Sequence, residues 1–173
     1  MPELTPLPTH SYQCGILTLS DKGAAGLRKD ESGQSLQNIL TKEGFLVTAY
    51  QIIADEESLI KEVLIDWSDR LKLDLVVTTG GTGVSPRDRT PEATMAVLDI
   101  EIPGISEAMR MESFKITPRA MLSRGRSGVR GQTLITNLPG STKAAEENIA
   151  IILPCLVHAI YKIKGGGDDC GGE

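Results

Sequence analysis

Residues 73–83 read LDLVVTTGGTG, an apolar run that passes directly into a glycine-rich segment. A short apolar run bounded by turn residues is typical of a buried strand, so we expect a strand over residues 73–79. Glycines that follow a buried strand let the backbone approach a ligand closely and turn its N–H groups toward an anion. The stretch therefore predicts a buried sheet strand with a ligand-binding loop at its carboxyl end.

The rest of the chain alternates between strand and helix patterns. Further strands are expected over residues 14–19, 45–53 and 132–138, and helices over residues 32–43 and 56–71, from Thr90, after Pro103-Gly104, and from Ser141 toward Lys164. Thr90 is expected to cap its helix with Pro91 in the first position, and Pro154 to kink the last helix or restart it. Alternating strands and helices predict a single three-layer α/β/α domain with a mostly parallel sheet.

Composition excludes several classes of protein. The 173 residues suit one domain at about 150 residues per domain. A net charge of −5 and 3% aromatic residues argue against nucleic-acid binding. The three cysteines show no CxxC spacing, so neither a disulfide framework nor a zinc site is expected. No apolar run approaches the roughly 18 residues that cross a membrane, and the start lacks a signal-peptide pattern, so we expect a cytoplasmic protein.

Domain boundaries follow from the two ends of the chain. Residues 1–11 contain three prolines and are expected to be a flexible lead-in, residues 12–164 to form the domain, and residues 165–173 to be a disordered glycine-rich, acidic tail. Cys155 and His158 are expected in the core or at an interface. Met95, Met109, Met111 and Met121 are expected in the core.

Ligands of parallel sheets bind at the carboxyl ends of the strands. The loop Thr79-Gly80-Gly81-Thr82-Gly83 lies at such an end. It is not a dinucleotide fingerprint, because Pro86 stands where a third glycine would be required, and no GKS or GKT follows as in a P-loop. A tight turn that needs positive φ is the alternative explanation, but three glycines with several threonines favour a ligand loop.

Two aspartates follow strands on the same predicted edge. Asp55 follows the second strand, and Asp88 lies between Arg87 and Arg89 just after the glycine loop. Asp55 could simply cap a helix and Asp88 could form an Asx turn. If the two carboxylates meet, however, they could share a magnesium ion bound to a nucleotide, with the arginines on phosphate oxygens.

Residues 119–130 form a basic run in an acidic chain. The run holds Arg119, Arg124, Arg126 and Arg130 and no acidic residue. A solvated surface loop is the alternative, but arginine forks match phosphate and carboxylate geometry, so we expect an anion site. Together these features predict a phosphate-rich ligand and phosphoryl or nucleotidyl transfer, which depends on positioning and charge neutralisation.

The motifs resemble those of the MogA/MoaB molybdopterin-binding family. The resemblance rests on residues 75–83 (LVVTTGGTG) and 85–93 (SPRDRTPEA), and it extends to LSDK at 19–22, DESG at 30–33, IADE at 53–56, LSR at 122–124, GVRG at 128–131 and NLPGS at 137–141. It covers roughly residues 13–164. Ala54 replaces the family's usual proline, and Arg89 is inserted between the aspartate and the threonine.

The resemblance implies an activity and its residues. In the MogA branch, a molybdopterin adenylyltransferase uses ATP and Mg²⁺ to attach AMP to the terminal phosphate of molybdopterin, releasing pyrophosphate. The functional aspartates of that branch map onto Asp55 and Asp88, expected as catalytic residues and metal ligands. Residues expected to bind substrate are Ser20, Asp21, Thr79, Gly80, Gly81, Thr82, Gly83, Arg87, Ser123, Arg124, Asn137, Pro139, Gly140 and Ser141. Ser123 and Arg124 form the motif associated with molybdopterin.

Two other functions stay open. A MoaB-like homologue would bind molybdopterin without turning over ATP, and the same domain serves as an assembly module in larger fused proteins. The family also implies a homotrimer, and a downstream molybdate-insertion protein is a further expected partner. The apolar residues of the last helix, from Ile151 to Ile160, suggest that part of its surface meets another subunit.

Overall fold

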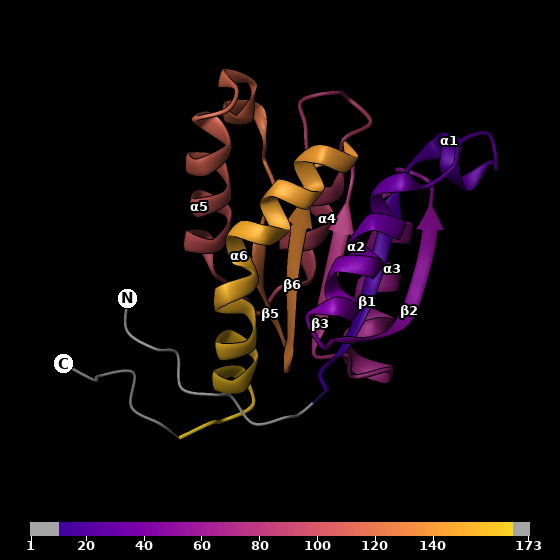
Figure 1. Cartoon of the computed structure of the whole chain (residues 1–173). Coiled ribbons are helices and arrows are strands. Elements are labelled where there is room, and N and C mark those ends of the chain that lie inside the picture. Colours follow the sequence, from indigo (N-terminus) through magenta and orange to yellow (C-terminus); the bar gives the residue numbers. More distant parts are fainter. Residues whose placement is uncertain (1–10, 168–173) are drawn as a thin grey trace.

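The computed structural model describes residues 11–167 and has one sheet of six strands in the order β2-β1-β3-β6-β5-β4 (Figure 1). The strands are β1 (Gln13–Leu19), β2 (Leu46–Ile53), β3 (Leu75–Thr79), β4 (Ile100–Glu101), β5 (Ser127–Arg130) and β6 (Thr133–Leu138). The predicted lead-in, except Ser11, and the last six residues of the predicted tail lie outside the described residues.

Four neighbouring strands, β2, β1, β3 and β6, run parallel, while β5 is antiparallel to β6 and β4 to β5. The predicted mostly parallel α/β sheet is therefore confirmed. The sequence did not reveal β4 and β5. Both are short, and β5 lies inside the arginine- and glycine-rich run, where pairing with β6 rather than an apolar pattern produces the strand.

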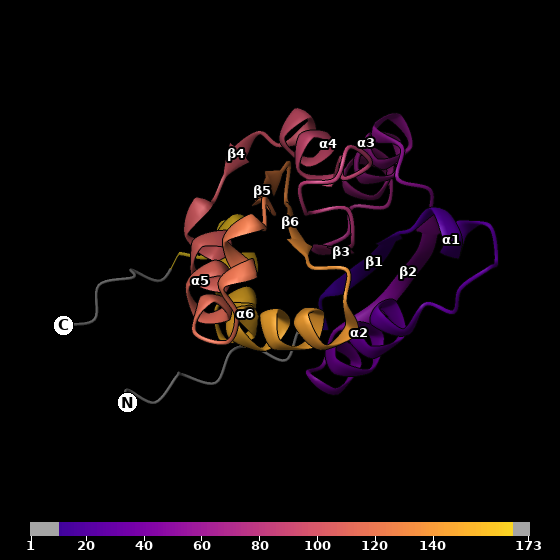
Figure 2. The same ribbon diagram turned by 90° about the horizontal axis from the view of Figure 1, so that it is seen from above.

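Helices cover both faces of the sheet (Figure 2). They are α1 (Asp21–Ala24), α2 (Glu31–Lys42), α3 (Glu57–Ile65), α4 (Thr90–Val97), α5 (Pro103–Phe114) and α6 (Thr142–Ile163), with a π-helical turn η1 (Asp66–Arg70) and a 3-10 turn η2 (Pro118–Leu122). One core joins α2, α5 and α6 to the sheet, and the other joins α3 and α4 to its opposite face. This is the predicted three-layer arrangement.

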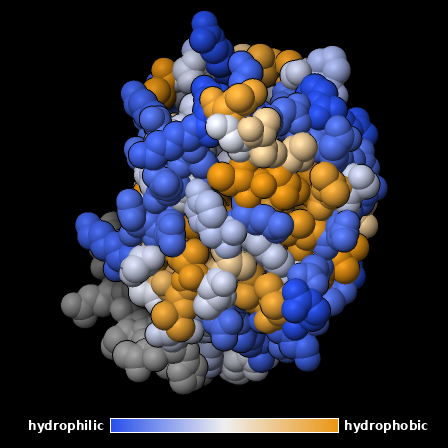
Figure 3. All heavy atoms as spheres, turned by 90° about the vertical axis from the view of Figure 1, so that its right-hand side faces the viewer, coloured by the Kyte–Doolittle hydropathy of each residue, from blue (hydrophilic) through white to orange (hydrophobic). Residues whose placement is uncertain are grey.

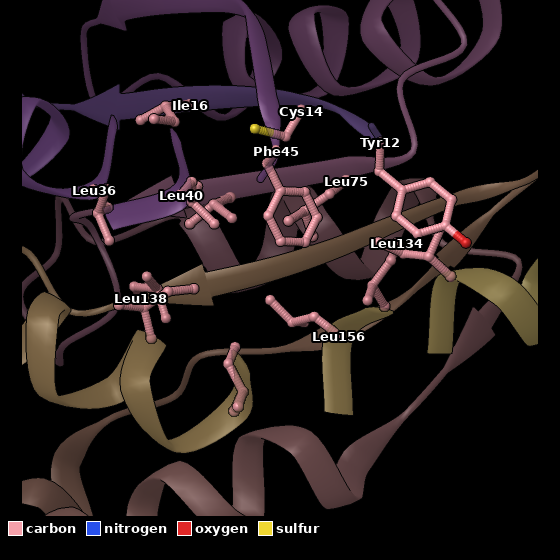
Figure 4. Close-up of a cluster of buried hydrophobic side chains, with 14 of the residues drawn as sticks. Tyr12, Cys14, Ile16, Leu36, Leu40, Phe45, Leu75, Leu134, Leu138 and Leu156 are labelled. Carbon is pink, nitrogen blue, oxygen red and sulfur yellow. The ribbon is translucent and has the colours of Figure 1, made fainter. Parts of the chain in front are cut away.

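Side-chain alternation along the central strands supplies both cores. Ile16 and Val77 point to the α2–α6 face, whereas Leu17 and Val76 point to the α3–α4 face. Figure 4 shows the first core, where Leu36 of α2 and Leu156 of α6 approach the sheet. Because both faces are covered, the central parallel strands β1, β3 and β6 are buried almost throughout, as residues 73–79 suggested, whereas the edge strand β2 is partly exposed.

Pro154 lies inside α6 without interrupting it. The helix bends part-way along, as both views show (Figures 1 and 2), which fits the hydrogen bond that a proline removes. Ile152, Leu156 and Ile160 of this helix are buried in the core of the same chain. The predicted kink is confirmed. These three residues, however, are not available to contact another subunit.

By length and composition alone, α6 could cross a membrane, and among the described helices it is the one that could. Its buried residues pack in the core beside those of α2 and α5. That packing is the ordinary arrangement of a core helix in an α/β domain.

Other predictions needed correction. The helix expected over residues 56–71 ends at Ile65 and continues as the π-helical turn. Met109 is buried as predicted, but Met95, Met111 and Met121 are exposed, because their sides of α4, α5 and η2 face away from the sheet. Cys155 and His158 are exposed in the single chain, so they are not in its core, and their place at an interface stays a prediction.

The open edge of the sheet at β2 carries apolar surface. Figure 3 views the molecule from the side on which β2 lies, and hydrophobic atoms gather in the middle of that face between hydrophilic margins. Leu46, the first residue of β2, is half exposed. An uncovered edge strand with apolar surface near it is a place where another chain can pack.

Candidate functional site

The four parallel strands deliver their loops to one edge of the sheet, at the top of Figure 1. Ser20 and Asp21 follow β1, Asp55 follows β2, the glycine loop follows β3, and Pro139 and Gly140 follow β6. The residues that the sequence singled out after separate strands are therefore neighbours in space. This meeting of strand ends is the candidate site.

The glycine loop needs glycine at two positions. Gly80 and Gly81 have φ of 103° and 64°, which disfavour any other residue. A Cβ on Gly80 would lie 2.4 Å from the carbonyl oxygen of Leu19, and one on Gly81 would lie 2.3 Å from Oγ1 of Thr90. The turn is therefore both conformationally special and crowded against β1 and α4.

Thr90 does not cap α4 as predicted. Its hydroxyl donates to the carbonyl oxygen of Gly80 (2.9 Å), and its amide donates to the carbonyl oxygen of Gly81 (3.2 Å). Arg89 holds the N-cap position without a side-chain cap, and Pro91 lies in the first turn. Thr90 thus ties the start of α4 to the glycine loop, because its buried hydroxyl finds an acceptor there.

Two clefts open on either side of this loop. The first, of about 720 Å³, is polar and includes Ser20, Asp55, Thr79, Ser141 and the start of α2. The second, of about 430 Å³, lies between the glycine loop, α5, η2 and the start of α6, and includes Thr82, Gly83, Ser123 and Pro139. Gly81, Asp88 and Gly140 line both clefts. The wall between the clefts is therefore built from the two loops that follow β3 and β6.

Asp55 and Asp21 hold each other through their backbones. The amide of Asp21 donates to Oδ2 of Asp55 (3.1 Å), and the amide of Asp55 donates to Oδ1 of Asp21 (3.0 Å). Asp55 is therefore no helix cap; Glu56 occupies that position. Arg87 pairs with both Asp21 and Glu56 at 2.8 Å, and its hydrogen bonds lower the pKa of Asp21.

The pKa of Asp55 is raised above that of an isolated aspartate. Burial raises its pKa, and the negative charges of Asp21 and Asp88 raise it further, against lowering by the Asp21 amide and Arg87. Asp88 accepts a hydrogen bond from the amide of Ser85 on Oδ2 (2.8 Å). The two carboxylates that the sequence paired thus face one cleft and repel each other.

The chemistry of this pair suits a magnesium ion whose remaining ligands would be water and substrate phosphates. Within residues 11–167, no three acidic, histidine or cysteine side chains form a metal cluster. Magnesium is usually held by one or two carboxylates together with waters and substrate phosphates, not by a closed protein cage. Asp55 and Asp88 could hold such an ion, whose positive charge would offset their mutual repulsion.

The basic run does not form one anion site. Arg119 lines the second cleft, and Arg130 pairs with Asp69 away from it. Arg124 and Arg126 line a third cleft of about 400 Å³, with Arg110 and Ser123. Arg126 also pairs with Glu101. The guanidinium of Arg124 donates to the carbonyl oxygens of Gly83 and Asp88 and to Glu92. Strand β5 separates the arginines, because it carries the end of the run toward the opposite edge of the sheet.

Other predicted residues are engaged within the protein. The amide group of Asn137 is buried; it donates to Thr78 and Thr94 and accepts from the amide of Arg126. The hydroxyl of Thr79 donates to the carbonyl oxygen of Pro139 (2.7 Å). Arg89 pairs with Glu57 on α3. Asn137 and Arg89 line neither of these two clefts.

Sequence reasoning missed part of the polar cleft. Arg28, Lys29, Asp30 and Ser32 line it at the start of α2. Burial raises the pKa of Asp30, but hydrogen bonds from Thr18, Tyr50 and other donors outweigh it and hold the pKa below its ordinary value. The sequence pattern that could have identified these residues is Asp-x-Ser-Gly directly after two basic residues, which is typical of a helix start. In the structure, Asp30 caps α2 by accepting a hydrogen bond from the amide of Gly33 (2.9 Å).

The second cleft also contains residues that carried no sequence signal. Arg110 and Ser113 come from α5, Thr117 precedes η2, and Asn148 lies on α6. Asn148 is 35 residues from Ser113 in the chain, and the packing of α5 against α6 brings it to the other three. No motif could have identified them.

Comparison with known proteins identifies the family to which this chain belongs. Residues 15–158 match the family described as "Probable molybdopterin binding domain". The molybdopterin adenylyltransferase of Helicobacter pylori is 42% identical over 155 residues, which are 87% of each chain. That of Escherichia coli K12 is 38% identical over 160 residues, covering 88% of this chain and 81% of the relative.

A solved structure agrees with the sequence relatives. The crystal structure of the molybdopterin biosynthesis enzyme MoaB from Thermus thermophilus is 51% identical, with a TM-score of 0.85, and the match covers 89% of this chain and 97% of that one. The resemblance to the MogA/MoaB family is confirmed, and the predicted enzyme class is the one that the curated relatives carry by name. With a match over residues 15–158 and relatives aligned along most of their length, this chain belongs to the family of probable molybdopterin-binding domains.

Proposed function

We propose that the chain transfers AMP from ATP to molybdopterin in a magnesium-dependent reaction that yields adenylyl-molybdopterin and pyrophosphate. The observation that carries this proposal is the wall shared by the two clefts, formed by Gly81, Asp88 and Gly140. A group transfer between two substrates needs their reacting groups side by side. Two clefts that share an acidic residue and a glycine loop satisfy that requirement.

The chemistry of each cleft suggests its ligand. The polar cleft has Arg28, Lys29 and the first turns of α2 and α6 in its lining, which suit the phosphates of ATP. The second cleft combines apolar Met109 and Leu122 with polar side chains such as Asn148. An apolar lining with a few polar groups suits the pterin of molybdopterin. Its phosphate would then point toward the shared wall.

Asp55 and Asp88 would hold the magnesium ion, which, when bound, neutralises charge on the phosphate oxygens. The chain's own contribution is positional. The glycine loop keeps the backbone close to the phosphates because Gly80 and Gly81 leave no side chain in the way. Asp21 fixes the loop that carries Asp55 through their paired hydrogen bonds.

A second candidate is a MoaB-like protein that binds molybdopterin without using ATP. The observation in its favour is the 51% identity to the Thermus structure named MoaB. The presence of both Asp55 and Asp88 on one cleft favours the transferase, since a binding protein has no need of two mutually repelling carboxylates.

The experiment is an incubation of the chain with ATP, Mg²⁺ and molybdopterin, followed by mass analysis of the pterin product. The transferase gives adenylyl-molybdopterin that depends on all three components. Molybdopterin that stays bound and unmodified would favour the MoaB-like alternative. Binding of neither compound would contradict both.

We also propose that the chain is a cytoplasmic homotrimer that passes its product to a molybdate-insertion protein. Exposed Met111, Phe114 and Met121 on α5 and η2, rather than the buried face of α6, are available for subunit contact. Light scattering at micromolar concentration should give three times the chain mass. A stable mass near 18.6 kDa would contradict the trimer.

A further inference from the structure

The side chain of Arg124 spans the two ends of the segment that carries Asp88. Its Nε donates to the carbonyl oxygen of Gly83 (2.7 Å), and its Nη2 donates to the carbonyl oxygen of Asp88 (2.7 Å). Its Nη1 pairs with Glu92 on α4. The amide of Arg124 itself donates to the carbonyl oxygen of Thr82 (2.9 Å). One residue therefore connects the glycine loop, the far end of the segment and the following helix.

Between these two carbonyls the segment has one other side-chain anchor, Arg87, which pairs with Asp21 and Glu56 on the loops after β1 and β2. Positions 84–87 are exposed, and Val84 keeps 63% of its surface accessible. Inside the segment, the amide of Asp88 donates to the carbonyl oxygen of Ser85 (2.9 Å), and the amide of Ser85 donates to Oδ2 of Asp88 (2.8 Å). The direction of the Asp88 carboxylate is thus set by the turn, and the turn is fixed at both ends by Arg124.

We infer that Arg124 is a positioning residue that fixes the turn of residues 83–88 and, through it, the carboxylate of Asp88 on the wall between the clefts. This assigns the guanidinium a different task from the ligand contact expected from the sequence, since three of its nitrogens already donate to the protein. A planar fork can reach two carbonyls and a carboxylate at once, whereas an ammonium acts as a point charge. The effect on AMP transfer rests on the proposed function; the effect on the turn does not.

Hydrogen exchange tests the structural step. The amides of Ser85 and Asp88 should exchange slowly in the wild type and at least about tenfold faster in Arg124→Ala and Arg124→Lys, because loss of the end contacts frees the turn. Arg130→Lys is a matched control. Arg130 also donates through three nitrogens to a carboxylate and a carbonyl, those of Asp69 and Val97, but at the opposite edge of the sheet. It should lose comparable thermal stability without faster exchange at residues 84–88.

Kinetics test the functional step. Arg124→Lys should lower kcat for AMP transfer by about 10- to 100-fold, the scale of a small misplacement of a reacting group, while leaving the KM for molybdopterin within about twofold. When Arg124→Lys is added to Asp88→Asn, it should lower kcat by less than about twofold further, because the carboxylate that Arg124 positions is already absent.

The outcomes separate the possibilities. Unchanged exchange at residues 84–88 in Arg124→Ala would overturn the inference. A large rise in the KM for molybdopterin with kcat preserved would also overturn it and return Arg124 to a ligand contact. Faster exchange in Arg124→Ala, when the wild type itself shows no AMP transfer at all, would confirm the positioning of the turn while refuting the proposed function.

Discussion

Asp21 and Asp55 exchange hydrogen bonds across the ends of two neighbouring strands, each amide donating to the other's carboxylate at 3.1 and 3.0 Å. The loops after β1 and β2 are thereby locked together, and Arg87 covers the pair by bonding to Asp21 and Glu56. Asp55 is consequently held in place before any ligand arrives. Its position relative to Asp88 is therefore a property of the folded chain. Each of the two carboxylates can accordingly be replaced alone to test its role.

Replacing either Asp55 or Asp88 with asparagine should reduce AMP transfer by at least about 100-fold and change molybdopterin affinity by less than about twofold. Asparagine keeps an oxygen for the neighbouring amide but loses the charge that attracts the cation. Steady-state kinetics and a separate molybdopterin titration measure the two effects. Turnover at the wild-type rate in both variants would show that the two-carboxylate site is wrong.

As the pH is lowered, AMP transfer should be lost at a higher pH than the pKa of an ordinary aspartate would set. Burial and the charges of Asp21 and Asp88 raise the pKa of Asp55, and only its ionised form attracts a cation. Protons and Mg²⁺ therefore compete, so raising the Mg²⁺ concentration should move the acid limb of kcat/KM to lower pH. An acid limb that stays fixed across Mg²⁺ concentrations, or that is unchanged in Asp55→Asn, would assign it to another group.

Asp30→Asn should lower the free energy of unfolding by about 2 kcal/mol at neutral pH, the scale of hydrogen bonds to a charged group. Thr18, Tyr50 and the amide of Gly33 donate to this nearly buried carboxylate and depress its pKa. A depressed pKa stabilises the fold above the unfolded value of about 3.9, and the gain is lost as the pH falls through the folded value.

The difference between wild type and Asp30→Asn should accordingly be full at pH 7 and shrink below about pH 4. Denaturant unfolding at several pH values measures it. Tyr50→Phe removes one of the donors and should cost less, about 1 kcal/mol. A difference between wild type and Asp30→Asn that persists unchanged at low pH would mean that shape, not charge, explains the loss.

Much of the fold was predictable because the central strands are buried on both faces. Strands β3 (LVVTT) and β6 (TLITNL) consist of apolar or hydroxyl-bearing residues except for Asn137, and they lie within the runs 73–79 and 132–138 that predicted them. Strand β5 was not predictable, since Val129 is the one apolar residue of Ser127–Arg130 and the strand pairs with β6 on one side and β4 on the other. The antiparallel edge of the sheet was therefore missed.

The candidate site shows the same division. Asp55, Asp88 and the glycine loop follow strands and could be placed from the sequence. The partners of the arginines could not, because charged side chains on loops choose partners that are distant in sequence, such as Arg124 with Glu92 and Arg130 with Asp69. The run of arginines interpreted as one site is therefore divided: Arg119 lines the second cleft, Arg124 and Arg126 line a third, and Arg130 lies toward the opposite edge of the sheet.

Gly81→Ala should cost about 3 kcal/mol or more in stability and abolish AMP transfer. A Cβ there meets Oγ1 of Thr90 and lies 3.1 Å from Oδ1 of Asp55, and the backbone has φ of 64°. Gly131→Ala is the control: it has φ of 56° but nothing within 4 Å of a new Cβ, so it should cost only about 1 kcal/mol. Equal losses in unfolding experiments would show that crowding at the loop is unimportant.

The release of pyrophosphate by the full chain, supplied with ATP and Mg²⁺ with and without molybdopterin, tests the central claim most directly. The account predicts pyrophosphate only when molybdopterin is present, one per adenylyl-molybdopterin formed, and almost none from Asp88→Asn even though that variant still binds molybdopterin. Tight binding of molybdopterin by the wild type with no pyrophosphate released at any Mg²⁺ concentration would contradict it.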